Sequence, residues 1–220
     1  MHSLHEPKAR VLIIACGALA KEIVALKNLN EWHHLDIQCI DAKLHHRPAL
    51  IPARLKEQIE RYRDQYEKIF VGYADCGTAG GIDRLIEEYG IERLPGADCF
   101  ACFAGLDNFK ALNDEELGTF YLTDFLVRQF DFMVIQMLGI DKHPELRDDY
   151  FGNYKRVVYL SQIEDEKLLN AAKVAAERLS LPFVHLHCGY GEVERALSAQ
   201  LVQRISVYPN HGKKSSHILA

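Results

Sequence analysis

The stretch GYADCGTAGG, residues 72–81, decides how the rest of the chain is interpreted. Residues 68–73 form an apolar run typical of a buried strand, and residues 82–89 have the spacing of a helix. A glycine-rich turn between a strand and a helix lets the backbone approach a ligand closely and directs N–H groups toward it. Cys76 lies in this turn, where the N-terminus of the following helix favours thiolate over thiol. The turn is therefore the first candidate for a functional site.

The same order of strand, Cys-Gly and helix occurs twice more. Residues 11–15 lead into Cys16-Gly17, and residues 183–187 lead into Cys188-Gly189. A single cysteine in this position is readily explained as a small buried residue that packs well at the end of a strand. Three such units in one chain favour a shared site.

Strands alternate with helices along the whole chain. Strands are expected at residues 9–16, 35–40, 69–73, 91–94, 118–124, 157–160 and 182–187. This alternation predicts an α/β fold, a three-layer sandwich with a mainly parallel, Rossmann-like sheet. The strands are solidly apolar, as expected where helices cover both faces.

No linker rich in proline, glycine or serine divides the sequence. We therefore expect a single domain over residues 1–205 and a polar C-terminal tail over residues 206–220. Two half-sheets, over residues 9–115 and 118–205, are an open alternative within that domain. In the second half the spacing predicts a helix over residues 125–138 and an irregular connection over residues 139–154.

Composition excludes several classes of protein. The chain has 220 residues, 48% of them hydrophobic and 26% charged, with a net charge of −5. It has no basic stripe with interleaved aromatic residues, so nucleic-acid binding is not expected. The longest apolar runs are too short for a membrane span, and the N-terminus lacks the plan of a signal peptide. We therefore expect a cytoplasmic protein.

The six cysteines indicate metal or catalytic chemistry, because disulfides are rare in a reducing compartment. Cys16, Cys76 and Cys99 each begin a turn or helix after a predicted strand, and His45 follows another strand. Because ligands of parallel sheets bind beyond the carboxyl ends of the strands, these four residues are expected to converge. Thiolates and imidazole are ligands of zinc and of iron–sulfur clusters, so we expect a zinc ion or a 4Fe–4S cluster.

The other cysteines are weaker candidates. Cys39 lies inside a predicted strand and Cys102 one helical turn after Cys99, so both are expected in the core. Cys188 alternates with His185 and His187, and these three could face a cleft or pack internally.

Two carboxylates and a phenol are the candidate catalytic groups. Asp75 and Asp124 are placed to act as a general base or to orient another group, although Asp124 is equally typical of a helix cap. Tyr121 supplies a hydrogen-bonding group near a strand end.

The backbone at Gly17, Gly77 and Thr78 is expected to approach a bound cofactor. The turn after Cys76 is neither a Walker loop nor a GxGxxG motif. A phosphate or carboxylate bound to its amides is an alternative to metal chemistry.

Taken together, these segments resemble a family of bacterial and archaeal proteins, the domain of unknown function 1638 family. The resemblance covers most of residues 9–200 and rests on residues 15–19, 44–51, 72–77, 95–99, 118–124 and 151–154. It implies ligands at Cys16, His45, Cys76 and Cys99. It also implies a link to corrinoid-dependent methyltransferases for methylated amines, and hence to one-carbon metabolism.

The first hypothesis is a metalloenzyme acting on a small polar or methylated metabolite by hydrolysis, lyase chemistry or methyl transfer. The second is a non-catalytic metal-binding accessory of a corrinoid protein or methyltransferase, and the third is a metal-free protein that binds small anions. A homo-oligomer is compatible with each of them.

Overall fold

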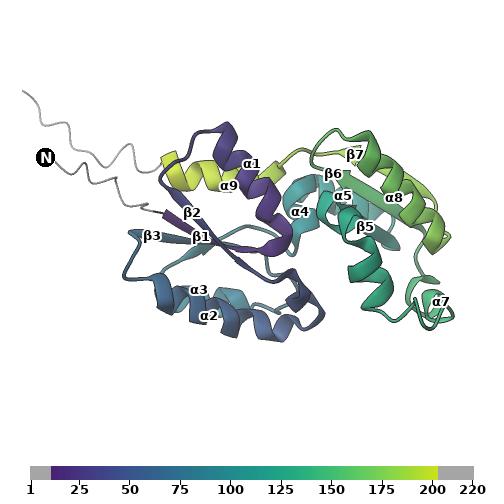
Figure 1. Ribbon diagram of the computed structural model, residues 1–220, viewed down its shortest axis with the longest axis horizontal. Helices are drawn as coiled ribbons and strands as arrows, with labels where there is room; N and C mark the ends of the chain where they lie inside the picture. Colours follow the sequence, from purple (N-terminus) through teal and green to yellow (C-terminus); the bar gives the residue numbers. More distant parts are fainter. Residues whose placement is uncertain (1–10, 203–220) are drawn as a thin grey trace, which may run out of the picture.

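The computed structural model describes residues 11–202 and contains two parallel sheets that lie side by side along the long axis (Figure 1). The first sheet has the strand order β2-β1-β3-β4 and the second has the order β5-β6-β7. The strands are β1 Val11–Cys16, β2 Leu35–Ile40, β3 Lys68–Gly72, β4 Glu92–Arg93, β5 Thr119–Thr123, β6 Arg156–Ser161 and β7 Phe183–His187. The α/β fold with two half-sheets is confirmed.

The first sheet is built around β1, in which every residue is buried. Its neighbour β3 runs parallel to it and brings Gly72 opposite Ala15. A Cβ at Gly72 would lie 2.9 Å from the Cβ of Ala15, so only glycine fits at this crossing. Helices α1 (Ala20–Leu29) and α9 (Gly191–Val202) cover one face, and α2 (Ile51–Tyr62) and α3 (Gly81–Tyr89) cover the other (Figure 1).

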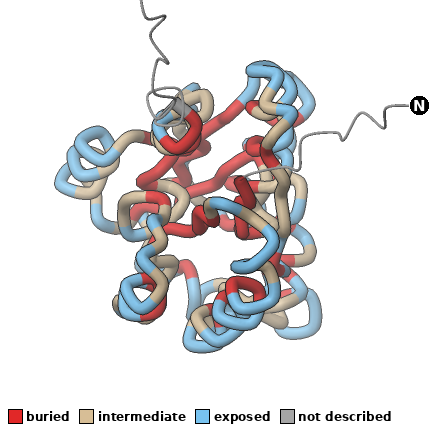
Figure 2. Tube along the Cα trace, turned by 90° about the vertical axis from the view of Figure 1, so that its left-hand side faces the viewer, coloured by how far each residue is buried: buried red, intermediate tan, exposed pale blue. Residues whose placement is uncertain are grey.

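The second sheet is also enclosed on both faces. Along β6, Val157 and Tyr159 belong to the core shared with α6 (Asp124–Arg128) and α8 (Glu166–Leu179). The alternate residues Val158 and Leu160 belong to the core on the opposite face, where α4 (Cys99–Ala104) and α5 (Leu106–Glu115) pack. Figure 2 shows the buried strands enclosed by helices whose outer turns are exposed. Each half thus has helix, sheet and helix layers.

The segment between β5 and β6 differs from the prediction. The helix expected over residues 125–138 ends at Arg128, and a wider π-helical turn follows over Asp131–Gln136. The consecutive residues Met133, Val134 and Ile135 are all buried there, so this turn is packed on more than one side. The connection expected to be irregular contains α7 (Leu146–Phe151).

The last helix returns to the first sheet. Val193, Leu197 and Leu201 of α9 belong to the same core as β1 and β3, and α9 also packs against α1 and α4. A boundary at residue 118 therefore separates the two sheets but not their helical layers. The predicted tail, residues 206–220, lies outside the described residues. Between residues 11 and 202, none of the helices combines the length and apolarity that crossing a bilayer requires.

Candidate functional site

The carboxyl end of the first sheet gathers three of the predicted ligand residues. Cys16 ends β1, His45 lies in the 3-10 turn Ala42–His46 that follows β2, and Cys76 follows β3. These strands are parallel neighbours, so their carboxyl ends meet at one edge. The Cys16 Sγ atom is 3.9 Å from His45 Nδ1. The predicted convergence of Cys16 and His45 is therefore seen directly.

Backbone pairing brings the fourth residue, Cys99, to the same place. The N–H of Cys76 donates to the carbonyl of Ala97 at 2.7 Å, and the N–H of Asp75 donates to the carbonyl of Gly96 at 3.2 Å. The loop before α4 is thus held alongside the Cys76 turn. Because α4 begins at Cys99, this cysteine lies two residues after Ala97, the last residue of the pairing.

The turn that carries Cys76 is conformationally strained. Cys76 has φ 51° and Ala79 has φ 52°, both in the left-handed region that side chains with a Cβ rarely adopt. Gly77 and Gly80 in the same turn also have positive φ values, which glycine adopts without strain. Strained residues of this kind cluster at functional sites, because the surrounding structure must hold them in place.

The imidazole of His45 is neutral and held in a fixed orientation. Its Nδ1 atom lies 2.9 Å from the carbonyl of Ala42, and its ring is stacked 6.2 Å from that of Tyr73. Burial lowers the pKa of His45 below its usual 6.5. When Nδ1–H donates to Ala42, the lone pair of Nε2 is free, an arrangement common among histidine ligands of metals.

The three thiols interact with one another electrostatically. Burial raises the pKa of Cys16 to about 12. Burial, together with the charges of the neighbouring cysteines, also raises the pKa of Cys76 and of Cys99 above the ordinary value of 9.0. Cys16 affects both of the other thiols, and Cys76 affects Cys99. The thiols therefore stay protonated at neutral pH unless a cation compensates their charge, and the expectation that Cys76 favours thiolate is wrong because burial outweighs the helix N-terminus.

Tyr73 has an unsatisfied polar group beside these thiols. The side chain is fully buried, and its hydroxyl has no hydrogen bond of good geometry. Burial raises its pKa, and the charge of Cys16 and a side-chain contact with the same thiol add to the shift. A buried hydroxyl without a well-formed hydrogen bond is unfavourable, so this atom has bonding capacity for a further group. The sequence pattern gives no signal for Tyr73, because its position at the end of an apolar run is typical of an ordinary buried strand residue.

The donor atoms fit a metal in kind and in neighbourhood, but they do not form a closed coordination shell. In residues 11–202, no three histidine, cysteine, aspartate or glutamate side chains lie close enough to hold a metal ion. Soft thiols with one imidazole are the donor set of zinc and iron–sulfur sites. Coordination would therefore require these side chains to move closer together.

A cavity of about 310 Å³ opens beside the thiols, between the two sheets. Cys76, Cys99 and His45 line it on the side of the first sheet. Phe120 and Phe125, together with other apolar residues, line it on the side of the second sheet. Its size lies at the lower end of the range for small-molecule pockets.

With the site described, the chain can be compared with known proteins. Residues 39–197 match the family described as protein of unknown function (DUF1638). The chain belongs to this family. No curated protein matches it.

Among solved structures, the chain is similar to ornithine carbamoyltransferase from Pyrococcus furiosus. The identity is 11% and the TM-score is 0.25, and the match covers 82% of this chain and 55% of that chain. The chain thus spans about half the length of that transferase. A TM-score this low supports no argument about fold or function.

The family match includes three of the four candidate ligands. His45, Cys76 and Cys99 lie within residues 39–197, and Cys16 lies before them. The matched residues do not include Cys16, whose place at the site is supported in the structure by its contact with His45.

Asp75 holds the strained turn together. Its Oδ1 atom accepts hydrogen bonds from Thr78 Oγ1 at 2.8 Å and from Gly80 N at 2.7 Å. Burial acts to raise its pKa, but the hydrogen bonds from Gly80, Thr78 and Ala79 outweigh it, and the pKa is lowered. These contacts give both Asp75 and Thr78 a role in positioning Cys76, and their predicted catalytic and cofactor-binding roles stay predictions.

The other predicted backbone positions also lie at this edge of the sheet. Gly17 follows Cys16, and a Cβ there would lie 3.1 Å from the carbonyl oxygen of Ile40. Gly77 follows Cys76 with φ 77°. Both glycines therefore allow tight backbone turns next to the thiols.

Asp124 lies at the carboxyl end of the second sheet and is fully buried. Its Oδ1 atom accepts hydrogen bonds from Tyr159 Oη at 2.6 Å and from Gln162 N at 3.1 Å. Its Oδ2 atom accepts one from Ile163 N at 3.3 Å and lies 3.6 Å from Arg128 Nη2. The carboxylate thus joins β5, β6 and α6, and its predicted catalytic role stays a prediction.

Tyr121 faces away from the cavity. Its hydroxyl donates to Asn113 Oδ1 at 2.9 Å, and its ring packs against Phe100 and Phe109. The structure thus places Tyr121 in the core between β5 and α5 and outside the lining of the cavity, and its predicted catalytic role stays a prediction.

The remaining cysteines have different environments. Cys39 is exposed, so its predicted core position is wrong; β2 is an edge strand, and its side chains are not all covered. Cys102 is buried as predicted, with Sγ 3.0 Å from the carbonyl of Pro95. Cys188 is half-buried on the face of the second sheet covered by α4 and α5.

Two histidines that precede Cys188 share one hydroxyl. Ser161 Oγ lies 2.9 Å from His185 Nε2 and 3.0 Å from His187 Nδ1. These contacts link the ends of β6 and β7.

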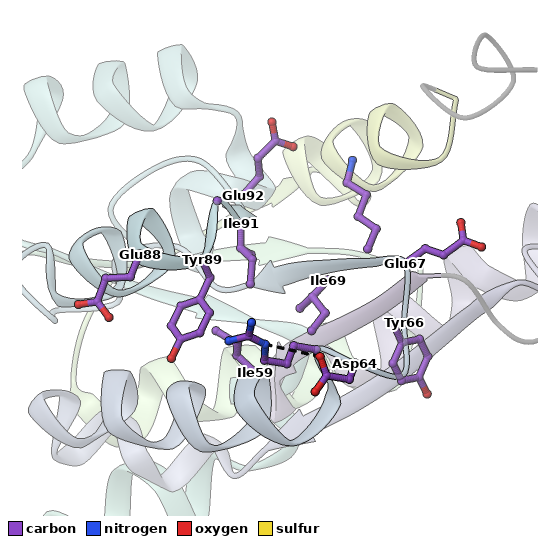
Figure 3. Close-up of a pocket in the computed structure, with 12 residues that line it drawn as sticks. Ile59, Asp64, Tyr66, Glu67, Ile69, Glu88, Tyr89, Ile91 and Glu92 are labelled. Carbon is purple, nitrogen blue, oxygen red and sulfur yellow. Dashed lines mark ion pairs between the residues drawn. The ribbon is translucent and has the colours of Figure 1, made fainter.

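A larger pocket, of about 590 Å³, lies at the opposite edge of the first sheet. Figure 3 shows it at the amino ends of β3 and β4, with charged residues around it, including the ion pair of Arg63 and Asp64. Parallel sheets bind ligands at the carboxyl ends of their strands. The smaller cavity beside the thiols is therefore the better candidate site.

Proposed function

We propose that the chain is a metalloenzyme in which Cys16, Cys76, Cys99 and His45 bind a zinc ion or a 4Fe–4S cluster. It would act on a small polar or methylated metabolite in the adjoining cavity, with a role in one-carbon metabolism. One observation supports this above all: the turns that carry these four residues lie at one edge of the sheet, and three of the residues line a ligand-sized cavity there.

The side chains of the site have distinct tasks in this proposal. His45 donates Nδ1–H to Ala42 and offers Nε2 to the metal. The three cysteines supply thiolates, whose negative charges a bound cation would stabilise. The Tyr73 hydroxyl would donate a hydrogen bond to a thiolate or to a bound oxygen, which would satisfy its missing contact. When bound, the metal would act as a Lewis acid or activate water or a thiol, as hydrolysis, lyase chemistry and methyl transfer require.

The metal-free alternative, a small-anion binder, receives less support from the glycine-rich turn. The N–H groups of Cys76, Thr78, Gly80 and Gly81 already donate to acceptors of the protein. An anion at this turn would have to displace those bonds. The accessory-protein alternative predicts that the metal-loaded chain binds a corrinoid protein without catalysing a reaction. Co-purification and turnover assays would distinguish this alternative from an enzyme.

Metal analysis of the full chain, purified without oxygen, tests the proposal. We expect about one zinc per chain, or iron and sulfide with a visible absorbance band. The variants Cys76→Ala and Cys99→Ala should lose most of the metal and keep the circular dichroism spectrum of the fold. Cys39→Ala, which removes an exposed cysteine, is the matched control and should keep the metal.

Wild-type protein that stays metal-free after anaerobic reconstitution with zinc, or with iron and sulfide, would overturn the proposal. Equal metal contents in Cys76→Ala and Cys39→Ala would also overturn it, because the metal would then be bound elsewhere.

A further inference from the structure

We infer that the substrate of this site carries a substantial apolar part, alkyl or aryl, and a single polar end. This inference rests on the proposed function and narrows it, because a fully polar metabolite does not suit the cavity. The two halves of the chain would each bind one part of such a molecule.

The lining of the cavity is divided between the halves. The first half contributes every lining side chain with a polar group or a thiol except Thr123, namely His45, His46, Cys76, Asp98 and Cys99. It also contributes the apolar residues Ala18, Leu19, Ala42, Phe100 and Phe103. The second half contributes a wall of apolar side chains, namely Phe120, Phe125, Leu126, Met133, Val134, Leu138 and Phe151. The ligand would therefore lie across the junction, with its polar end toward the thiols.

The apolar wall offers a ligand little hydrogen bonding. Thr123 is the polar residue that the second half contributes to the lining, and its Oγ1 already accepts from Leu126 N at 3.3 Å. A hydroxyl or amide of a ligand placed against this wall would lose its bonds to water without replacing them, which is unfavourable. The wall thus selects against polar groups at that end.

The volume limits the size of the apolar part. An apolar cavity of about 150 Å³ holds one benzene molecule. The cavity here, about 310 Å³, is roughly twice as large, and part of it adjoins the thiols. A branched or straight alkyl chain, or one to two rings, would fill the remainder.

Calorimetric binding of straight-chain primary alcohols, from butanol to octanol, to the full-length protein tests this inference. Affinity should rise about fourfold for each added methylene until the cavity is filled. Diols of the same length, with a second hydroxyl at the apolar end, should bind at least tenfold more weakly. Affinity that is independent of chain length, or higher for the diols, would overturn the inference.

A cavity-filling variant makes the test specific to this site. Leu126→Trp places a large side chain in the apolar wall and should weaken octanol binding at least tenfold. Val174→Trp, on an exposed position of α8 away from the cavity, is the control and should leave affinity unchanged. Leu138→Trp is the second variant if Leu126→Trp does not fold. Octanol binding that is unaffected in a folded wall variant would overturn the inference.

The outcomes separate this inference from the metal proposal. The alcohols are also titrated against the metal-free variant Cys76→Ala, where the slope per methylene should be kept. A wild-type protein without metal that retains this slope would overturn the metal proposal alone. A metal-loaded protein whose affinity for the alcohols does not rise with chain length would overturn the inference of an apolar substrate and leave the metal proposal intact.

Discussion

The carboxyl ends of the two sheets differ in how far their polar groups are satisfied. At the second sheet, the buried carboxylate of Asp124 accepts hydrogen bonds from Tyr159, Gln162 and Ile163. At the first sheet, neighbouring thiols have few partners, and the buried hydroxyl of Tyr73 has no good hydrogen bond. The difference indicates that the second sheet uses its polar residues for stability, whereas the first leaves bonding capacity for a ligand.

The strongest test of this difference is the loss of Asp124. We expect Asp124→Ala to lower the free energy of unfolding by about 3–5 kcal/mol, because it leaves a buried network and Arg128 without their partner. Urea denaturation followed by circular dichroism measures this value. Asp165→Ala, which removes an exposed cap of α8, should cost only about 1 kcal/mol. Equal costs in the two variants would contradict the structural role of the second site.

The two halves are joined by a pair of charges that is incompletely satisfied, and this pair gives the next prediction. Glu22 of α1 lies 3.9 Å from Arg128 of α6, and Glu22 Oε2 is buried without a partner. Burial raises the pKa of Glu22 from its ordinary 4.5, although Arg128 partly opposes the shift. The folded protein therefore binds this proton more tightly than the unfolded chain does. Stability should rise as pH falls through the raised folded pKa toward 4.5, where the gain is complete.

The expected gain is about 1.4 kcal/mol for each unit by which the pKa is raised. Urea unfolding of wild type and Glu22→Gln at several pH values measures it. The variant should lack the gain on acidification, and the exposed-site variant Glu87→Gln should retain it. If the free energy of unfolding of Glu22→Gln changes with pH as steeply as that of the wild type, the Glu22 carboxylate has adequate partners at the junction and its pKa is not raised.

A smaller effect is expected at the unsatisfied hydroxyl of the first site. In metal-free protein, Tyr73→Phe should raise the free energy of unfolding by about 1 kcal/mol, because it removes a buried group without a partner. In metal-loaded protein the same change should lower metal affinity, if the hydroxyl contacts the bound group. Tyr159→Phe, which removes a hydroxyl bonded to Asp124, should be destabilising under both conditions. Destabilisation by Tyr73→Phe in the absence of metal would mean that the hydroxyl already has a partner.

Sequence patterns predicted the strands and the placement of Cys16 and Cys76 at their ends for a simple physical reason. Apolar runs followed by Cys-Gly identify where buried parallel strands end, so the placement of Cys16 and Cys76 followed from topology. The position of Cys99 depended on the backbone bonds from Asp75 and Cys76 to the following loop, which local sequence does not reveal.

Other features depend on tertiary contacts that periodicity does not record. Tyr73 reads as an apolar strand residue, and only the fold shows that its hydroxyl has no partner. The sequence pattern predicts Cys39 in the core, but this residue is exposed because β2 is an edge strand. The return of α9 to the first sheet is equally invisible, because its apolar spacing fits either sheet.

The smallest predicted effect concerns the backbone strain at Cys76. Cys76→Gly should be more stable than Cys76→Ala by about 1 kcal/mol, because glycine adopts φ 51° without the clash of a Cβ. Ala79→Gly, at φ 52° in the same turn, provides a matched comparison with wild type and should show a similar gain. Urea unfolding of the metal-free proteins measures both differences. If Cys76→Gly is no more stable than Cys76→Ala while Ala79→Gly is stabilised, the turn holds Cys76 without strain. The carboxyl end of the first sheet would then resemble that of the second more closely, because Cys76 would not destabilise the fold.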